Sequence, residues 1–351
     1  MKQLIRILLL SILLLSCSKK VKYIDKEAKI NIVPLPKSIN LIDPGKHILL
    51  SKKIKVFINF KDNKNLYDLI SNDFKKLSYS NSFELVTNKN MSNLSLEIDK
   101  ELNDEEYEIS IHNKIIIKGG SLNALKMARS TLLQLSVNDK GRMTFPILTI
   151  KDNPDAGYRG LLIDLARKWH SAETIYKLID LASFYKLNYL QFHLTDDQLF
   201  TFPSENFPKL QTTDYHYTKE ELSSFVDYAY QRGVIIIPEI DVPGHSMQFV
   251  KKYPEIFSTT SPEKRHEDLF GGKLEFANVL NIGKEDVYTS LEKLFLEVMD
   301  TFHTSPYFHL GADEANLKVI VDDPYVKNFM KKNKLGNDIH ELYRYFIVRM
   351  N

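Results

Sequence analysis

The chain has 351 residues, of which 43% are hydrophobic and 26% are charged, a composition typical of a globular protein with about two domains. Lysine and arginine (47) nearly balance aspartate and glutamate (45), and the resulting net charge of +2 lacks the basic excess of a nucleic-acid-binding protein, so no nucleic-acid partner is expected. The single cysteine excludes a disulfide framework and a structural zinc site built on cysteines.

The first 17 residues, MKQLIRILLLSILLLSC, have the pattern of an export signal. Lys2 and Arg6 precede an apolar run over residues 7–15, which is shorter than the about 20 residues that span a bilayer but typical of a signal-peptide core. Cys17 follows Leu-Leu-Ser, which resembles the lipobox of bacterial lipoproteins, whose cysteine is acylated. The resemblance implies a lipid anchor on Cys17, a tether over residues 18–30 and a membrane-anchored protein of the cell envelope, outside the cytoplasm. The alternative is a plain signal peptide with a chance cysteine.

Residues 31–151 alternate short apolar runs with turn-forming clusters, which predicts a small α+β domain. The apolar periods predict strands over 54–59, 94–98, 107–111 and 114–118, and helices over 67–77 and 121–135. Because this region shows no cluster of catalytic residue types, we expect it to support the rest of the chain.

Residues 152–351 change to a rhythm of strand, loop and helix. The pattern predicts strands over 160–164, 189–194, 234–240 and 307–310, and helices over 172–185, 218–232, 286–301 and 338–350. Ser171 is an expected N-cap, and Thr218 with Glu221 forms an expected capping box. Successive βα units indicate an α/β fold, either a doubly wound sheet or a (β/α) barrel, and the lack of a glycine-rich phosphate loop argues against a nucleotide-binding fold.

Acidic and histidine side chains follow the end of each of these four strands. They are Asp164 with Arg167, then His193, Asp196 and Asp197, then Asp241 and His245, and finally His309, Asp313 and Glu314. In a barrel the carboxyl ends of all strands face one mouth, so these groups are expected to share one pocket. Such a cluster suits a hydrolase that works with carboxylates or a metal-dependent hydrolase, and spacing alone leaves both open.

Four ordered motifs carry a more specific signal: YRGLLIDLAR (158–167), KLNYLQFHLTDDQ (186–198), PEIDVPGH (238–245) and HLGADE (309–314). Together they resemble the signatures of family 20 glycoside hydrolases, the β-N-acetylhexosaminidases. The resemblance implies a (β/α)8 TIM-type barrel preceded by a small α+β domain. It further implies exo-acting hydrolysis of terminal β-linked N-acetylglucosamine or N-acetylgalactosamine, with a glycan or chitin-type oligosaccharide as substrate and without metal or cofactor.

The resemblance also implies roles for single residues. In this family the acetamido oxygen of the substrate is the nucleophile and forms an oxazolinium. Glu314 matches the general acid and base, and Asp313 matches the residue that orients the acetamido group. Arg159 matches a sugar-binding arginine, and Asp196 and His245 match polar residues of the substrate site beside the acid. The expected supporting hydrogen-bond network is Asp164, His193, Asp241 and His309.

One geometric condition follows from the strand pattern. Neighbouring residues of a regular strand point to opposite faces, so Asp313 and Glu314 can share one pocket only if the backbone leaves strand geometry at Gly311 and Ala312.

The predicted barrel region is shorter than the about 250 residues of a typical full barrel. We therefore expect only the first half of the barrel in this chain, and little or no hexosaminidase activity from the chain alone. A complementing chain or self-association is one alternative, and strands hidden in residues 259–281 are another. A non-catalytic glycan-binding lipoprotein is the alternative function.

Overall fold

The computed structural model describes residues 21–61, 63–260, 266–267 and 272–351. The chain divides into two compact units, Met1–Asp155 and Ala156–Asn351. The expected export signal and Cys17 lie outside the described residues. Among the helices of the described part, none has both the length and the apolar character needed to cross a membrane.

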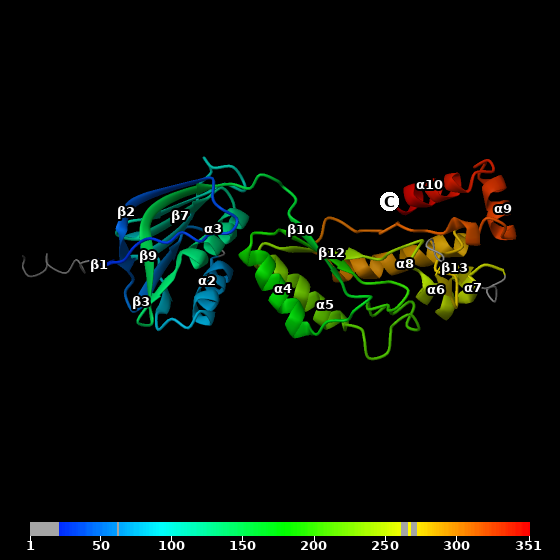
Figure 1. Cartoon of the computed structure of the whole chain (residues 1–351), viewed down its shortest axis with the longest axis horizontal. Helices are drawn as coiled ribbons and strands as arrows, with labels where there is room; N and C mark the ends of the chain where they lie inside the picture. The colour runs from blue at the N-terminus through cyan, green and yellow to red at the C-terminus, as the bar shows by residue number, and fades with distance from the viewer. Residues whose placement is uncertain (1–20, 62, 261–265, 268–271) are drawn as a thin grey trace, which may run out of the picture. The chain divides into compact units, whose positions relative to one another are not determined.

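The first unit is a nine-stranded mixed sheet with two helices on one face (Figure 1). Its strands are β1 (Lys22–Asp25), β2 (Ser38–Leu49), β3 (Lys53–Ile58), β4 (Ser82–Leu85), β5 (Leu94–Ile98), β6 (Tyr107–Ile111), β7 (Ile115–Gly119), β8 (Val137–Asp139) and β9 (Arg142–Asp152). They lie in the order β1-β2-β9-β6-β7-β5-β3-β4, with β8 paired to β9, and β4, β3, β5 and β7 run parallel to one another. The helices are α2 (Lys64–Lys76) and α3 (Leu122–Leu135), and a short 3-10 turn, η1 (Lys89–Met91), precedes β5.

Alternating burial explains this arrangement. In β3 the side chains of Ile54, Val56 and Ile58 are buried and their neighbours are not, as expected for a strand with one face under helices. Helix α3 begins at an N-cap, Ser121, whose hydroxyl accepts the amide hydrogen of Ala124, and it is buried along most of its length. The first unit therefore has its own core.

Within the expected tether, residues 18–30, the structure describes residues 21–30 and corrects the prediction there. Residues 22–25 form strand β1, which pairs antiparallel with the end of β2, and the backbone amides of Lys26 and Ala28 continue the contact with Gly45 and Pro44. The segment is polar, which favoured a tether, but its backbone groups pair with β2.

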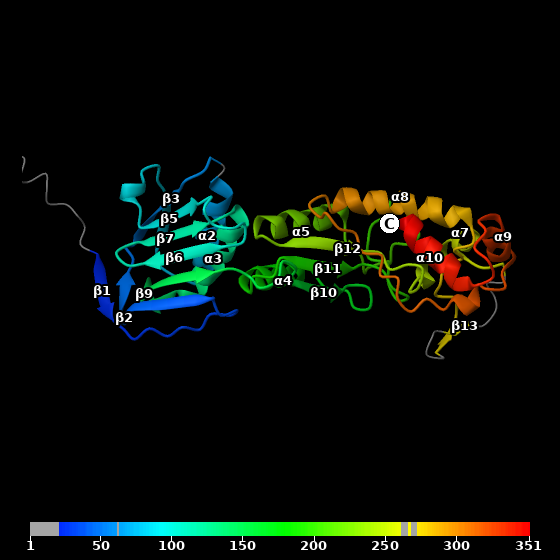
Figure 2. The same ribbon diagram turned by 90° about the horizontal axis from the view of Figure 1, so that it is seen from above.

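The second unit begins with three parallel strands, β10 (Gly160–Asp164), β11 (Tyr189–His193) and β12 (Ile235–Glu239), in that spatial order (Figure 2). Its helices are α4 (Ala172–Phe184), α5 (Lys219–Gln231), α6 (Met247–Lys252), α7 (Pro254–Phe257), α8 (Glu285–Thr301), α9 (Pro324–Lys332) and α10 (Ile339–Met350), with the 3-10 turn η2 (Leu317–Val319). The expected N-cap at Ser171 and the capping box of Thr218 and Glu221 are both present. Buried side chains of β10, β11 and β12 pack with those of the helices in one apolar cluster.

The expected fourth strand, over residues 307–310, is reduced to a single parallel bridge between His309 and Glu239. The amide of His309 donates to Pro238, and the amides of Ile240 and Val242 donate to His309 and Leu310. The segment thus takes the place of a fourth parallel strand beside β12, but it has no further parallel neighbour among the described residues. In the described part of 259–281 the strands are β13 (His266–Glu267) and β14 (Lys273–Leu274), which pair only with each other and antiparallel.

Candidate active site

The register of the parallel strands aligns four polar residues at their carboxyl ends. Asp164 pairs with His193 between β10 and β11, His193 pairs with Glu239 between β11 and β12, and Glu239 forms the bridge to His309. Because the carboxyl ends of parallel strands meet at one edge of the sheet, these four side chains lie side by side at the base of the site, and we call them the floor.

Glu239 is the centre of this floor and was not singled out from the sequence. Its carboxylate lies 3.3 Å from Nδ1 of His193 and 3.3 Å from Nδ1 of His309, and it accepts a 2.7 Å hydrogen bond from the amide of Gln191. Burial by itself would raise the pKa of Glu239, but the hydrogen bonds from His193, His309 and Gln191 outweigh it and lower this pKa to about 2. A glutamate that ends the apolar run Ile-Ile-Ile-Pro is a signal that could have identified it, since buried acids require partners.

Asp196 continues the network toward the mouth. Its buried carboxylate contacts Nε2 of His193 at 3.0 Å, Nδ1 of His245 at 3.3 Å and Nη2 of Arg167 at 2.6 Å. Burial opposes ionisation of Asp196, but the hydrogen bonds from both histidines outweigh burial and hold its pKa below the usual range. For His193, burial lowers the pKa, whereas Asp196 and Glu239 raise it to about 10. A continuous chain of charge-assisted contacts therefore runs from Glu239 through His193 and Asp196 to His245.

His245 joins this buried chain to the expected catalytic pair. Its Nδ1 faces Asp196, and this hydrogen bond is the main reason that the pKa of His245 is raised to about 9. Its Nε2 lies 3.4 Å from Oε2 of Glu314 and 3.7 Å from Oδ2 of Asp313. Both carboxylates therefore lie on the same side of the backbone, around one imidazole nitrogen, and their side chains are 63% and 45% exposed for Asp313 and Glu314 respectively.

The backbone leaves strand geometry where the sequence required it to do so. Gly311, Ala312 and Glu314 have φ values of 63°, 66° and 50°, all in the left-handed region. This turn replaces the alternation of a strand and brings two neighbouring acids to one face. The condition placed on Gly311 and Ala312 is met.

Asp241 holds this turn from below. Its Oδ1 accepts the amide hydrogen of Ala312 at 3.0 Å, and a Cβ atom on Gly311 would lie 2.1 Å from the same oxygen. Burial, followed by the negative charge of Asp313, raises the pKa of Asp241 to about 7. On the other side of the turn, the hydroxyl of Tyr343 on α10 donates to the carbonyl of Ala312. The turn is therefore fixed by one side chain from the sheet and one from the last helix.

The structure corrects the sugar-binding role expected of Arg159. Arg159 precedes β10 and lies at its amino end, about 16 Å along the strand from Asp164. Its guanidinium donates to the carbonyls of Lys186 and Ala156, so it stabilises the opposite end of the strands. The arginine at the site is Arg167, half exposed, whose guanidinium contacts Asp164 at 2.8 Å and Asp196 at 2.6 Å.

The same cluster contains three sets of donor atoms close enough to surround a metal ion. In each set the donor atoms lie within 4.8 Å of one another; the sets are His193 with Glu239 and Asp241, Asp196 with Asp197 and His245, and Asp241 with His245 and Asp313. A histidine ligand must be neutral, whereas the raised pKa values of His193 and His245 favour the protonated imidazolium. These residues are therefore better suited to sharing protons with carboxylates than to holding a metal ion.

Comparison with known proteins identifies the arrangement. The family model for the glycosyl hydrolase family 20 catalytic domain matches residues 157–351, and the model for domain 2 of the same family matches residues 29–153. This chain belongs to glycoside hydrolase family 20. Its fold is the α/β fold of that family, whose catalytic domain is a TIM-type barrel preceded by a small domain, as the motifs predicted; the described residues form three parallel strands of that barrel and the bridged segment beside them.

Relatives in family 20 match between 68% and 95% of this chain. The β-hexosaminidase of Porphyromonas gingivalis is 29% identical over 95% of this chain and 45% of the relative, and that of Vibrio furnissii is 30% identical over 68% of this chain and 42% of the relative. The chitobiase of Flavobacterium johnsoniae is 31% identical, with a TM-score of 0.77 over 92% of this chain and 50% of that chain. The exo-β-N-acetylglucosaminidase of Vibrio harveyi, solved in complex with N-acetylglucosamine, is 26% identical, with a TM-score of 0.82 over 94% of this chain and 54% of that chain. The chain spans about half the length of the curated relatives it matches.

Proposed function

We propose that this chain carries the catalytic carboxylates of an exo-acting β-N-acetylhexosaminidase, which removes terminal β-linked N-acetylglucosamine or N-acetylgalactosamine from glycans. The observation that supports this most is the placement of Asp313 and Glu314 around one nitrogen of His245 at the end of a buried ionic chain. The family membership and the names of the relatives agree with this reading.

In this proposal Glu314 is the general acid and base. Its carboxyl group protonates the oxygen of the leaving group and then accepts a proton from the water that opens the oxazolinium. Glu314 is half exposed, so a glycosidic oxygen can approach it, and Nε2 of His245 lies 3.4 Å from its carboxylate on the buried side.

Asp313 acts on the acetamido group of the substrate. Its carboxylate accepts the acetamido N–H, which turns the carbonyl oxygen toward the anomeric carbon, and it stabilises the positive charge that develops on the ring formed by that attack. The turn at Gly311 and Ala312 makes this possible, because it places Asp313 beside Glu314.

Arg167 is the residue that this geometry offers for binding sugar hydroxyls. Asp164 and Asp196 hold its guanidinium at the carboxyl end of β10, and its half-exposed side chain leaves N–H donors for a ligand. It takes the role that the sequence assigned to Arg159.

Localisation belongs to the same proposal. An export signal followed by an acylated Cys17 would hold the protein in the cell envelope, and the support for it is the sequence of residues 1–17. A Cys17→Ala variant is expected to lose incorporation of radiolabelled fatty acid. Unchanged labelling of this variant would contradict the anchor.

The catalytic proposal is tested by release of 4-nitrophenol from 4-nitrophenyl N-acetyl-β-D-glucosaminide. The assay uses the 351-residue chain and, because that chain spans half of its relatives, a chimera that continues into the second half of the Flavobacterium johnsoniae barrel. Glu314→Gln is expected to lower kcat at least about a hundredfold while binding of N-acetylglucosamine, measured by calorimetry, persists. The matched control is Glu292→Gln, which changes an exposed glutamate on α8 and is expected to change nothing.

The alternative function is glycan binding without catalysis. It would be favoured if the chimera binds N-acetylglucosamine but shows no turnover, or if Glu314→Gln leaves the rate unchanged. Loss of turnover on chelation of metal ions would instead favour a metal-dependent hydrolase.

A further inference from the structure

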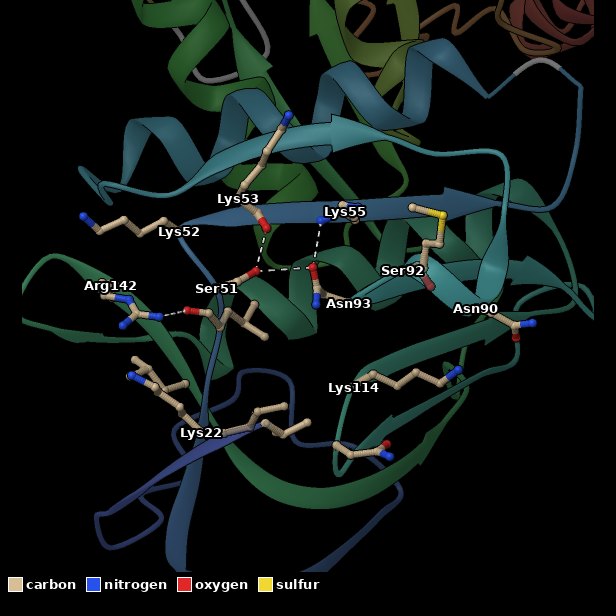
Figure 3. A pocket seen from close by; sticks show the side chains of 16 residues that line it. Lys22, Ser51, Lys52, Lys53, Lys55, Asn90, Ser92, Asn93, Lys114 and Arg142 are labelled. Carbon is tan, nitrogen blue, oxygen red and sulfur yellow. Dashed lines mark hydrogen bonds between the residues drawn. The ribbon is translucent and has the colours of Figure 1, made fainter. Parts of the chain in front are cut away.

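The first unit contains a hollow of about 910 Å³ at the end of the sheet where β3, β5 and β7 begin (Figure 3). It is lined by residues from the start of β1, the end of β2, the start of β3, the turn before β5, the turn before β7 and the start of β9. Its cationic lining residues are Lys22, Lys52, Lys53, Lys55, Lys114 and Arg142, and we call this feature the basic hollow. It is separate from the catalytic cluster, which belongs to the second unit.

Most of this charge is not neutralised by residues that the structure describes. No acidic residue is among the residues that line the basic hollow. Lys53 pairs with Glu84 at 3.1 Å, and the guanidinium of Arg142 donates to the carbonyl of Leu50. The other four lysines form no ion pair with any residue that the structure describes. The basic hollow therefore has an excess of positive charge among the described residues, which suits an anionic ligand.

The uncharged residues that line the basic hollow indicate which kind of anion it can bind. Val21, Ile48, Leu49, Leu50 and Met91 contribute aliphatic surface, and Ser51, Ser92, Asn90, Asn93 and Asn113 contribute small polar groups. No aromatic side chain, the usual platform for a sugar ring, lines the hollow. Lysines beside aliphatic side chains suit a phosphate headgroup that is attached to apolar chains.

The sheet also carries opposite charges at its two ends. The loop from β5 to β6 lies at the carboxyl end of the parallel strands and carries a net negative charge, since it holds one lysine, Lys100, and five acids, of which Asp99 pairs with Lys118; the others are Glu101, Asp104, Glu105 and Glu106. The basic hollow lies at the amino ends of the same strands. A negatively charged surface would attract the basic end, repel the acidic end and so orient this unit.

The path of the chain points to a membrane as that surface. Val21 and Lys22 line the basic hollow, and the sequence immediately before them carries Lys19, Lys20 and Cys17. A single acyl chain gives only weak membrane binding, and a basic patch is one of the second signals that make it stable.

We propose that the basic hollow is the face with which the first unit lies on a membrane, where its lysines bind the phosphate groups of anionic lipids. This inference does not rest on catalysis, because all its residues belong to the first unit.

Vesicle co-sedimentation tests the inference. All proteins are full chains with Cys17→Ser, so that no acyl chain contributes. Affinity is compared between phosphatidylcholine vesicles with and without phosphatidylglycerol, which cancels any contribution of the apolar segment at residues 7–15. The triple variant Lys52→Gln, Lys55→Gln and Lys114→Gln is expected to bind phosphatidylglycerol vesicles about a hundredfold more weakly at low salt, from about 1 kcal/mol for each lysine.

The matched control removes the same charge elsewhere in the first unit, with Lys75→Gln, Lys100→Gln and Lys140→Gln, all exposed and outside the hollow. It is expected to keep most of the affinity. Equal losses in both triple variants would show an effect of net charge alone and would overturn the proposal, as would unchanged binding of the first. Binding of a soluble sulfated oligosaccharide without any binding to vesicles would also overturn it, in favour of an acidic glycan. Both triple variants are expected to keep the activity of the parent chain, so the result is independent of the catalytic test.

Discussion

Asp241 is a buried acid whose pKa is raised to about 7, chiefly by burial and then by Asp313. The folded protein binds this proton more tightly than the unfolded chain, whose carboxyl has the ordinary value of 3.8. The contribution of Asp241 to the free energy of unfolding is therefore greatest below about pH 4 and falls as the pH rises through 7, by at most about 1.4 kcal/mol per pH unit.

Asp241→Asn removes this dependence and keeps an oxygen that can accept the amide hydrogen of Ala312. We expect the variant to gain stability relative to the wild type between pH 5 and about pH 8, as measured by urea unfolding at several pH values. If the difference in free energy of unfolding between the variant and the wild type does not change with pH, the raised pKa of Asp241 is contradicted.

Gly311 combines a left-handed φ of 63° with close contact to Asp241. Gly311→Ala is expected to cost about 2–4 kcal/mol, from backbone strain together with the clash of the new Cβ atom. Gly336 supplies the control, because its φ of 72° is similar and no atom lies within 4 Å of its Cβ position. Gly336→Ala is expected to lower the free energy of unfolding, measured by thermal unfolding, by about 1–2 kcal/mol. Equal losses at both sites would show that the contact of Gly311 with Asp241 does not add to the cost.

Helix α10 acts on the site through one hydroxyl. Tyr343 donates to the carbonyl of Ala312, and this bond ties the helix to the turn that carries both acids. Tyr343→Phe is expected to cost about 1 kcal/mol and to speed amide hydrogen exchange at residues 311–314. Tyr325→Phe on α9 is the control, since Tyr325 is half exposed, and it is expected to leave exchange at the turn unchanged. Unchanged amide hydrogen exchange in Tyr343→Phe would show that α10 does not stabilise the turn.

Elements of the second unit were predictable where a buried apolar run had clear boundaries. Strand β10 was predicted residue for residue, and α5 was found from its capping box. In the first unit the long strands β2 and β9 were missed. β2 contains the turn-like sequence Asp43-Pro-Gly-Lys and shifts register there, and β9 contains Pro146, so both read as interrupted.

The residues of the site were also predicted only in part from the sequence. The pairing of Asp313 with Glu314 followed from the motif, and the turn that it required is present. Arg159 and Arg167 flank one strand, and only the direction of that strand separates them, since the site lies at its carboxyl end. Glu239 could have been flagged as a buried acid from the apolar run that it ends, but its partners, His193 and His309, lie in other segments, which periodicity within one segment cannot reveal.

At the scale of the whole molecule, the two units divide the proposed tasks. The first unit holds the basic hollow, and the second unit holds Asp313 and Glu314. A variant in one unit is therefore expected to leave the property assigned to the other unit unchanged. Self-association or a complementing chain stays a prediction of the sequence.

The alignment of Asp164, His193, Glu239 and His309 has a consequence for folding. A slip of β12 by one residue would send Glu239 to the opposite face and set an aliphatic or proline side chain against His193. The buried imidazolium of His193 would then lose one of its two carboxylate partners and keep only Asp196, at a cost of about 1.5–3 kcal/mol. Mispaired strands are therefore penalised by the loss of the ion pairs that form in the correct register, so the polar floor favours its own assembly.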